Sequence, residues 1–118
     1  APPDANWRTI LADIMRAAGP IRHGDTLSAA LIRLATWPVS ADPDEADHLT
    51  AVNAALTAQL IVAAALLRTE SRGGHFRQDY PYSEESWRKH IVLCRQAEPW
   101  VVPTIAPVAE REKVGERR

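Results

Sequence analysis

Apolar residues recur at helical spacing through the first third of the chain. One stripe consists of Trp7, Ile10, Leu11, Ile14, Met15 and Ala18, and a second consists of Leu27, Ala30, Leu31 and Leu34. Side chains three and four residues apart lie on one face of a helix, so each stripe predicts an amphipathic helix. We expect these helices over about residues 5–18 and 26–36.

Turn and capping residues set the expected ends of these two helices. Asp4 is a candidate N-cap for the first helix, and Asp25 or Thr26 for the second, because short oxygen-bearing side chains accept hydrogen bonds from free backbone amides. Gly19-Pro20 is expected to end the first helix. Pro38 is expected to end the second, because a residue that precedes proline is disfavoured in the α region.

A third and longer helix is predicted over about residues 43–69. Asp42-Pro43 forms an N-cap and N1 pair, no helix breaker follows before Thr69, and Gly73-Gly74 are expected to end the helix. The stretch Leu60–Leu67 is apolar on every side and therefore has to be covered on every side. Two short stripes do not suffice for this, so we expect a further partner surface and self-association of the isolated chain.

The last third of the chain has a different character. Ser83, with Glu84 and Glu85, is expected to cap a short helix that carries Trp87 and Ile91. The stretch 100–108 contains prolines and indicates extended chain. The expected fold is all-α, with a three-helix bundle and a long third helix over residues 1–95. An irregular, partly extended segment is expected over 96–118.

Composition and charge narrow the possible functions. Ala occupies 20 of 118 positions, and charged residues make up 25%, as in a single globular domain. The net charge of −1 does not indicate a nucleic-acid-binding face. The single cysteine, Cys94, excludes an internal disulfide and a cysteine-based zinc site. The longest uninterrupted apolar run, eight residues, is far below the ~20 of a membrane span, and we expect a cytoplasmic protein.

The densest group of polar residues follows the predicted third helix. It comprises Glu70, Ser71, Arg72, Gly73, His75, Arg77 and Asp79. One interpretation is a contact with an anion or a cofactor phosphate, but phosphates favour helix N-termini and this is a C-terminal end. The other interpretation, which we favour, is a set of buried ion pairs. Arg72 and Arg77 would then pair with Glu70 and Asp79 and tie the loop to a neighbouring surface.

Other candidate chemistry is weak. His75 and His90 lack a third ligand at a recognisable spacing, so no metal site is expected. Neither a G-x-G-x-x-G nor a G-x-x-x-x-G-K-[ST] phosphate loop occurs, and a G-x-S-x-G nucleophile elbow is also absent from the sequence. The residue patterns therefore nominate no catalytic, cofactor-binding or metal-binding residue.

The segment 68–81, RTESRGGHFRQDYP, resembles the signature R-x-E-S-R-G-x-H-[FY]-R-x-D-[FY]-P of the succinate dehydrogenase, fumarate reductase and L-aspartate oxidase flavoproteins. Trp87 and His90 resemble the W-x-x-H that follows it in that family. Upstream, Met15 with Gly19 and Arg22 resembles its M…G-x-x-R connector between two helices. The resemblance extends over about residues 6–95.

The resemblance implies a C-terminal helical domain. In the family, an FAD-binding domain and a capping domain carry the cofactor and the substrate residues, and both would lie outside these 118 residues. We therefore expect a domain that supports a parent flavoprotein and that has neither cofactor nor activity alone. The FAD-binding and capping domains are its expected partners.

Within the family, the resemblance favours an L-aspartate oxidase, which oxidises L-aspartate to iminoaspartate in the first step towards quinolinate and NAD. The evidence is the short segment between Arg22 and the long helix, and the sequence Tyr82–Trp87 in place of the dehydrogenases' R-D-D stretch. Two alternatives stay open. One is a flavoprotein fragment of succinate dehydrogenase or fumarate reductase. The other is an independent helical module that docks a partner through Leu60–Leu67 and the Arg72/Arg77 pair.

Overall fold

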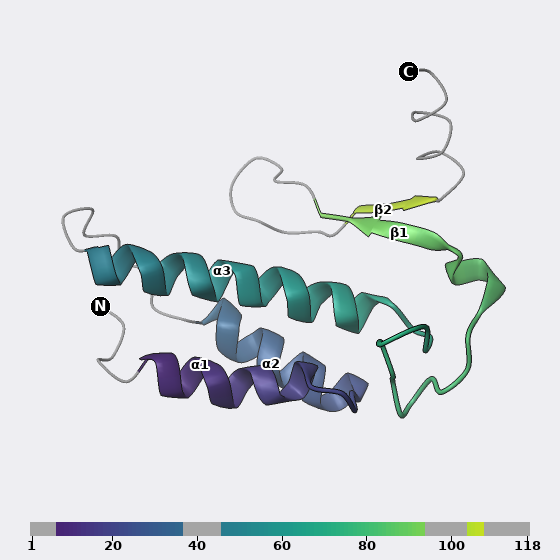
Figure 1. Ribbon diagram of the computed structural model, residues 1–118, viewed down its shortest axis with the longest axis horizontal. Coiled ribbons are helices and arrows are strands. Elements are labelled where there is room, and N and C mark those ends of the chain that lie inside the picture. Colours follow the sequence, from purple (N-terminus) through teal and green to yellow (C-terminus); the bar gives the residue numbers. More distant parts are fainter. Residues whose placement is uncertain (1–6, 37–45, 94–103, 108–118) are drawn as a thin grey trace, which may run out of the picture.

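A computed structural model of the chain describes residues 7–36, 46–93 and 104–107. Its helices are α1 (Trp7–Met15), α2 (Gly24–Ala35) and α3 (Ala46–Leu67), and a 3-10 turn, η1 (Arg16–Ala18), continues α1. Two short strands, β1 (Lys89–Val92) and β2 (Thr104–Pro107), form an antiparallel pair beyond the helices (Figure 1). The prediction of an all-α, three-helix fold with a long third helix is confirmed.

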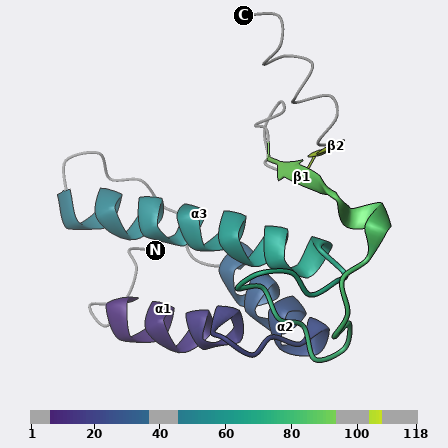
Figure 2. The ribbon, with the colours of Figure 1, turned by 45° about the vertical axis from the view of Figure 1, so that its right-hand side comes forward.

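The helices α1 and α2 pack on one side of α3 (Figures 1 and 2). The buried core consists of Trp7, Ile14, Leu27, Ala30, Leu34, Ala51, Ala55, Ala58, Val62 and Ala65. Both predicted stripes are confirmed, because their remaining members are partly buried against this core. The side of α3 that faces the other helices is mostly alanine, which allows close approach of the helix axes.

The long helix α3 is apolar beyond its packed side. Ile61 and Leu49 are 45% and 42% exposed, while Val62 is fully buried. By length and composition alone, Leu49–Leu67 could cross a membrane, with a mean hydropathy of 1.8. The count of the longest apolar run did not indicate this, because uncharged residues such as Asn53 and Gln59 interrupt the run without lowering the average much. Core helices of soluble proteins meet the same criterion, and α3 is the core helix of this bundle.

Three helix ends differ from the prediction. The α part of the first helix ends at Met15, and the chain tightens into η1 before Gly19. His23, not Asp25 or Thr26, caps α2, since its Nδ1 accepts a hydrogen bond from the backbone amide of Asp25 at 3.1 Å. The helix α3 ends at Leu67, well before the glycine pair that was expected to end it.

The predicted short helix that carries Trp87 and Ile91 is wrong. Glu85–Trp87 forms only a 3-10 turn, and Ile91 lies in β1. The guanidinium of Arg68 donates to the carbonyls of Trp87 (2.9 Å) and Lys89 (2.6 Å), so these oxygens are not available to helical amides. Ser83 does not cap this turn, because its hydroxyl donates to the carbonyl of Ser71 at 2.7 Å.

The strands pair with Lys89 opposite Pro107 and Val92 opposite Thr104. The strand β2 lies within the stretch predicted to be extended, and agrees with that prediction. The expected caps at Asp4 and Asp42-Pro43, and the buried position expected of Cys94, lie outside the described residues.

Candidate functional site

The residues 68–81, named here the motif loop, follow α3 directly and fold back beneath its end. Within it, the Glu70 carboxylate is fully buried. It accepts hydrogen bonds from Arg68 Nη1 (2.6 Å), Arg72 Nε (2.9 Å) and the backbone amide of Glu84 (2.9 Å). Burial raises the pKa of Glu70, but the bonds from Arg72, Glu84 and Arg68 outweigh it and lower the pKa to about 2. Glu70 is therefore ionised and fully partnered.

Arg77 joins the motif loop to the end of α3. Its side chain is 2% exposed. One edge of the guanidinium binds Asp79 in bidentate fashion, at 2.9 Å from Nε and 2.6 Å from Nη2. Nη1 donates to the carbonyls of Ala65 (3.2 Å), Leu66 (2.8 Å) and Arg68 (3.3 Å). The last turn of a helix leaves such carbonyls unpaired, so Arg77 is the cap that ends α3 at Leu67.

Asp79 continues this connection to α2. Besides Arg77, its Oδ2 accepts a hydrogen bond from the backbone amide of Gly24 at 3.0 Å, at the start of α2. The hydrogen bonds from Arg77 hold the pKa of Asp79 well below its usual range, against an opposing effect of burial, and the Gly24 amide adds to the lowering. The arginine–aspartate pair thus ties the C-terminal end of α3 to the N-terminal end of α2.

Ser71 and Gly73 shape the turn of the motif loop. The Ser71 hydroxyl donates to the carbonyl of Tyr80 (2.7 Å) and accepts from the backbone amide of Arg77 (2.9 Å). The backbones of Arg72 and His75 bond each other, and Gly73 between them has a φ of +59°, a conformation that favours glycine. The serine and the glycine therefore serve the loop's backbone.

His75 connects the motif loop to the segment between α1 and α2. The Arg68 carbonyl can only accept, so His75 Nε2 donates to it at 3.1 Å. An arginine can only donate, so His75 Nδ1 accepts from Arg22 Nη1 at 2.8 Å. Burial lowers the pKa of His75, and the nearby positive charges of Arg22, Arg77 and Arg68 lower it further, against the hydrogen bond to the Arg68 carbonyl. The imidazole is therefore neutral, with its proton on Nε2.

All seven residues nominated from the sequence thus lie in one connected loop. Both proposed ion pairs are present, Arg72 with Glu70 at 2.9 Å and Arg77 with Asp79 at 2.6 Å. Sequence reasoning missed the parts played by Arg22 and Gly24, because each lies more than fifty positions before the loop residue that it contacts. Their only signal was the glycine and arginine of the helix connector, which the family resemblance singles out.

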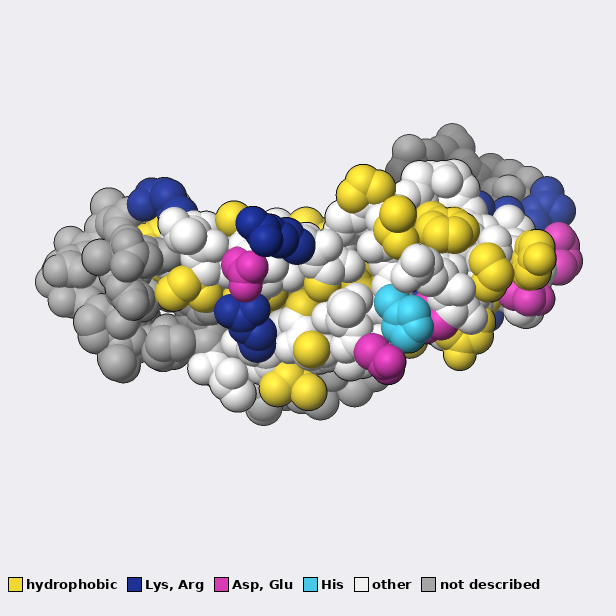
Figure 3. Space-filling view, turned by 90° about the horizontal axis from the view of Figure 1, so that it is seen from below, with side chains coloured by type: hydrophobic (Ala, Val, Ile, Leu, Met, Phe, Trp, Pro, Cys, Tyr) yellow, Lys and Arg dark blue, Asp and Glu magenta, His cyan; other side chains and the backbone are white. Residues whose placement is uncertain are grey.

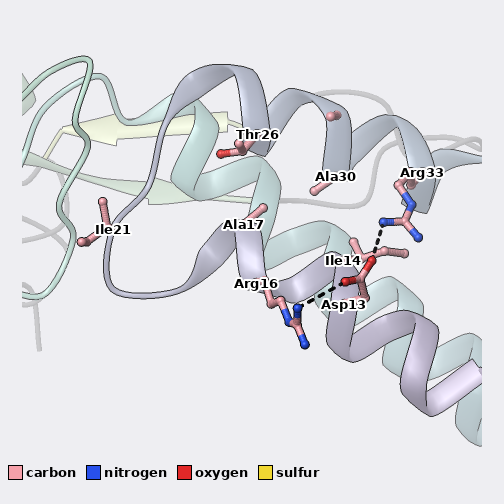
Figure 4. A pocket seen from close by; sticks show the side chains of 9 residues that line it. Asp13, Ile14, Arg16, Ala17, Ile21, Thr26, Ala30 and Arg33 are labelled. Carbon is pink, nitrogen blue, oxygen red and sulfur yellow. Dashed lines mark hydrogen bonds and ion pairs between the residues drawn. The ribbon is translucent and has the colours of Figure 1, made fainter.

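A second hollow lies between α1 and α2, with a volume of about 390 Å³ (Figure 4). Asp13 on its rim pairs with Arg16 at 3.8 Å and with Arg33 at 3.2 Å, while Ile14 and Ala30 form an apolar floor. On this face of the molecule, positive, negative and apolar side chains are interspersed (Figure 3). The mutual pairing of its charges gives this hollow no evident catalytic chemistry.

The described residues do not fit a flavin phosphate site. Such sites use a glycine-rich turn that leads from a strand into a helix N-terminus, where free amides face the phosphate. Gly73 and Gly74 instead follow a helix C-terminal end. In the described part of the chain, His, Cys, Asp and Glu side chains do not gather in a group of three that could hold a metal ion. The geometry therefore supports a structural motif.

Comparison with known proteins explains this arrangement. Residues 40–114 match the family described as "Fumarate reductase flavoprotein C-term", which is more than half of the chain. The chain belongs to this family. The family includes the L-aspartate oxidases and the succinate dehydrogenase and fumarate reductase flavoproteins, so the resemblance carried by the motif loop is confirmed.

Several relatives share this flavoprotein C-terminal domain. The chain is 33% identical to an L-aspartate oxidase of Nostoc sp. over 115 residues, which is 76% of this chain and 20% of the relative. It is 40% identical to an L-aspartate oxidase of Pyrococcus furiosus over 82 residues, which is 69% of this chain and 15% of the relative. A fumarate reductase (CoM/CoB) of Methanothermobacter marburgensis is 45% identical in one of its subunits over 47 residues, 40% of this chain and 9% of the relative.

A solved structure has the same fold. It is Mycobacterium smegmatis Sdh1 in complex with UQ1, with a TM-score of 0.57 and 28% sequence identity. The match covers 91% of this chain and 21% of that chain. This chain therefore spans about a fifth, or less, of the length of the relatives just described.

Proposed function

We propose that this chain is the C-terminal helical domain of an FAD-dependent L-aspartate oxidase. The parent enzyme would oxidise L-aspartate to iminoaspartate, the first step towards quinolinate and NAD, in the cytoplasm. The observation that carries this proposal is the alignment of about three quarters of the chain with proteins named L-aspartate oxidase from Nostoc and Synechocystis. The motif loop and the helix before it lie within the family match.

In this proposal the domain supports the FAD-binding and capping domains and performs no chemistry. Two features favour that role. The charged groups of Glu70, Arg77 and Asp79 are engaged with partners inside the chain. In addition, α3 keeps partly exposed apolar residues such as Leu49 and Ile61, which a neighbouring domain could bury.

A second candidate is the flavoprotein of a succinate dehydrogenase or fumarate reductase. Sdh1 of Mycobacterium smegmatis aligns with 91% of the chain, and the fumarate reductase of Methanothermobacter marburgensis shares 45% identity over the part that it matches. This candidate differs from the first in the substrate of the parent enzyme, and turnover can separate the two.

The test uses the full-length polypeptide that carries this segment, purified with its flavin. Hydrogen peroxide is measured with L-aspartate and oxygen, and aspartate consumption is measured with fumarate in the absence of oxygen. Succinate with an artificial electron acceptor is the matched control substrate. We expect turnover that depends on aspartate, with little or none on succinate. Succinate turnover without aspartate turnover would reject the oxidase and support the second candidate.

A further inference from the structure

A small pocket lies where the end of α3, the connector before α2 and β1 meet. Its volume is about 350 Å³, and it is lined by Arg22, Ile61, Ala64, Ala65, Arg68, His75 and Ile91. Two guanidinium groups and an imidazole thus share the wall with aliphatic side chains. The lining includes no carboxylate among the residues that the structure describes.

Arg22 is the notable residue of this pocket. Its guanidinium donates from Nε to the Gly19 carbonyl (3.1 Å), from Nη2 to the Ala18 carbonyl (3.2 Å) and from Nη1 to His75 Nδ1 (2.8 Å). All three acceptors are neutral. A guanidinium has five N–H groups, so each terminal nitrogen keeps one further N–H. Within the described ranges, neither of these has a protein acceptor, and Arg22 has no carboxylate partner.

The surroundings of Arg22 carry excess positive charge. Arg68 and Arg72 share the single carboxylate of Glu70, and Arg77 pairs with Asp79. Arg22 adds a fourth guanidinium to these three, against two carboxylates. His75 is neutral and cannot compensate. A half-buried cation without a counter-charge attracts an anion more strongly than a fully solvated one, because less water screens it.

We propose that this pocket is a binding site for a carboxylate group. The carboxylate accepts from the two remaining N–H groups of Arg22, in the bidentate geometry that guanidinium groups favour. The aliphatic part attached to it contacts Ile61, Ala64 and Ile91. The ligand is accordingly a short aliphatic carboxylate, either a free small molecule or the side chain of an aspartate or glutamate from a neighbouring part of the flavoprotein.

The existing hydrogen bonds of Arg22 prepare this site. Three bonds already fix the orientation of the guanidinium, so binding does not have to immobilise a flexible side chain. The hydrogen bond from Arg22 to His75 Nδ1 also makes the imidazole a direct reporter of the pocket. His23 and His90 are not among the residues that line the pocket and serve as internal references.

The test is a titration of the chain with sodium acetate, with sodium chloride at equal ionic strength as the control. The imidazole resonances of His75, His23 and His90 are followed by NMR. We expect a saturable shift of His75 alone with acetate, and none with chloride. Arg22→Gln should weaken acetate binding by about tenfold or more, because it removes the charged donor pair. Arg33→Gln, which removes an exposed arginine paired with Asp13, should leave it unchanged.

Because Arg22→Gln could disturb folding, Ala64→Met provides a second variant that fills the pocket and retains every charge. It should also abolish the acetate-dependent shift of His75. The same titration on the full-length polypeptide distinguishes the two sources. A retained saturable shift indicates a free carboxylate, whereas a pocket closed to acetate until Arg22 is replaced or the domains are separated indicates a side chain. A linear response to acetate and chloride alike in the 118-residue chain would overturn the proposal.

Discussion

Arg77 is the residue on which most of the motif loop depends. Its guanidinium is 2% exposed and binds Asp79 on one edge and the last carbonyls of α3 on the other. A buried guanidinium is stable only when its donors are paired, and these partners come from three segments of the chain. Arg77 therefore couples the end of α3, the motif loop and, through Asp79, the start of α2.

Arg77→Met tests this coupling. The variant keeps an aliphatic stem but leaves Asp79 and the helix carbonyls without their donor, so the free energy of unfolding should fall by about 3 kcal/mol. Urea unfolding followed by circular dichroism measures the change. Arg88→Met is the control, because the Arg88–Glu85 pair is exposed and should change stability by less than about 0.5 kcal/mol. Equal losses for the two variants would contradict the assigned role.

His75 gives the fold a dependence on pH. Its pKa is lowered from the usual 6.5, mainly by burial and by nearby arginines, so the unfolded chain binds a proton more readily than the folded chain does. The stability due to neutral His75 is fully present above pH 6.5 and should decrease as the pH falls below that value.

The measurement is urea unfolding at pH 7.5 and at successively lower pH down to 5, on the wild type and on His75→Gln. A glutamine can still accept from Arg22 and donate to the Arg68 carbonyl, but it does not titrate. The variant should therefore lose part of the decrease in stability between these pH values. An identical pH dependence in both proteins would show that His75 does not contribute.

At the scale of the elements, the connection between α2 and the motif loop depends on a missing side chain. A Cβ atom on Gly24 would lie 2.6 Å from Asp79 Oδ2 and 2.8 Å from Arg77 Nη2. Both atoms belong to a tightly held ion pair, so they cannot easily move away. The glycine is required at the first residue of α2 because the aspartate approaches its backbone so closely.

Gly24→Ala should therefore destabilise the chain by about 1–3 kcal/mol through overpacking, although alanine is the better helix former. Thermal and urea unfolding measure the loss. Gly74→Ala is the matched control, since no atom lies within 4 Å of the added methyl group, and its stability should stay within about 0.5 kcal/mol of the wild type. A stabilised Gly24→Ala variant would contradict the observed approach of Asp79.

The elements also show what the sequence could and could not predict. The stripes that include Trp7 and Leu27 identified the first two helices, because one-sided burial leaves a periodic pattern. The ion pairs of the motif loop were within reach as well, since their partners lie two residues apart. The strand at Ile91 was missed because its cause is distant: Arg68 takes the carbonyls of residues 87 and 89. The cap on α3 was missed for the same reason, since Arg77 lies ten residues beyond its end.

At the scale of the whole molecule, α3 leaves apolar residues without full cover. Ile61 and Leu49 are substantially exposed, and Ile32 of α2 and Ile21 of the connector are 65% and 64% exposed. Exposed apolar side chains in this number favour association with another surface. In the parent flavoprotein the FAD-binding and capping domains are the proposed partners.

The isolated chain should accordingly self-associate at high concentration. Sedimentation velocity over a range of concentrations should show a mass that rises above the monomer value of 13.0 kDa. Ile61→Gln, which makes an exposed position on α3 polar, should shift this equilibrium towards the monomer. A strictly monomeric profile of the wild type at every concentration would argue against an uncovered docking face.

The most direct test of the account asks whether the motif loop supports the enzyme or takes part in its chemistry. Arg72 is the cation of the loop best placed to reach another domain, since its side chain is 43% exposed while it pairs with Glu70. The measurement is aspartate turnover per bound flavin in the full-length Arg72→Gln variant, together with its thermal midpoint. The account predicts a lower midpoint with unchanged turnover per flavin and unchanged KM. A loss of turnover per flavin of about tenfold or more, with the midpoint unchanged, would contradict it.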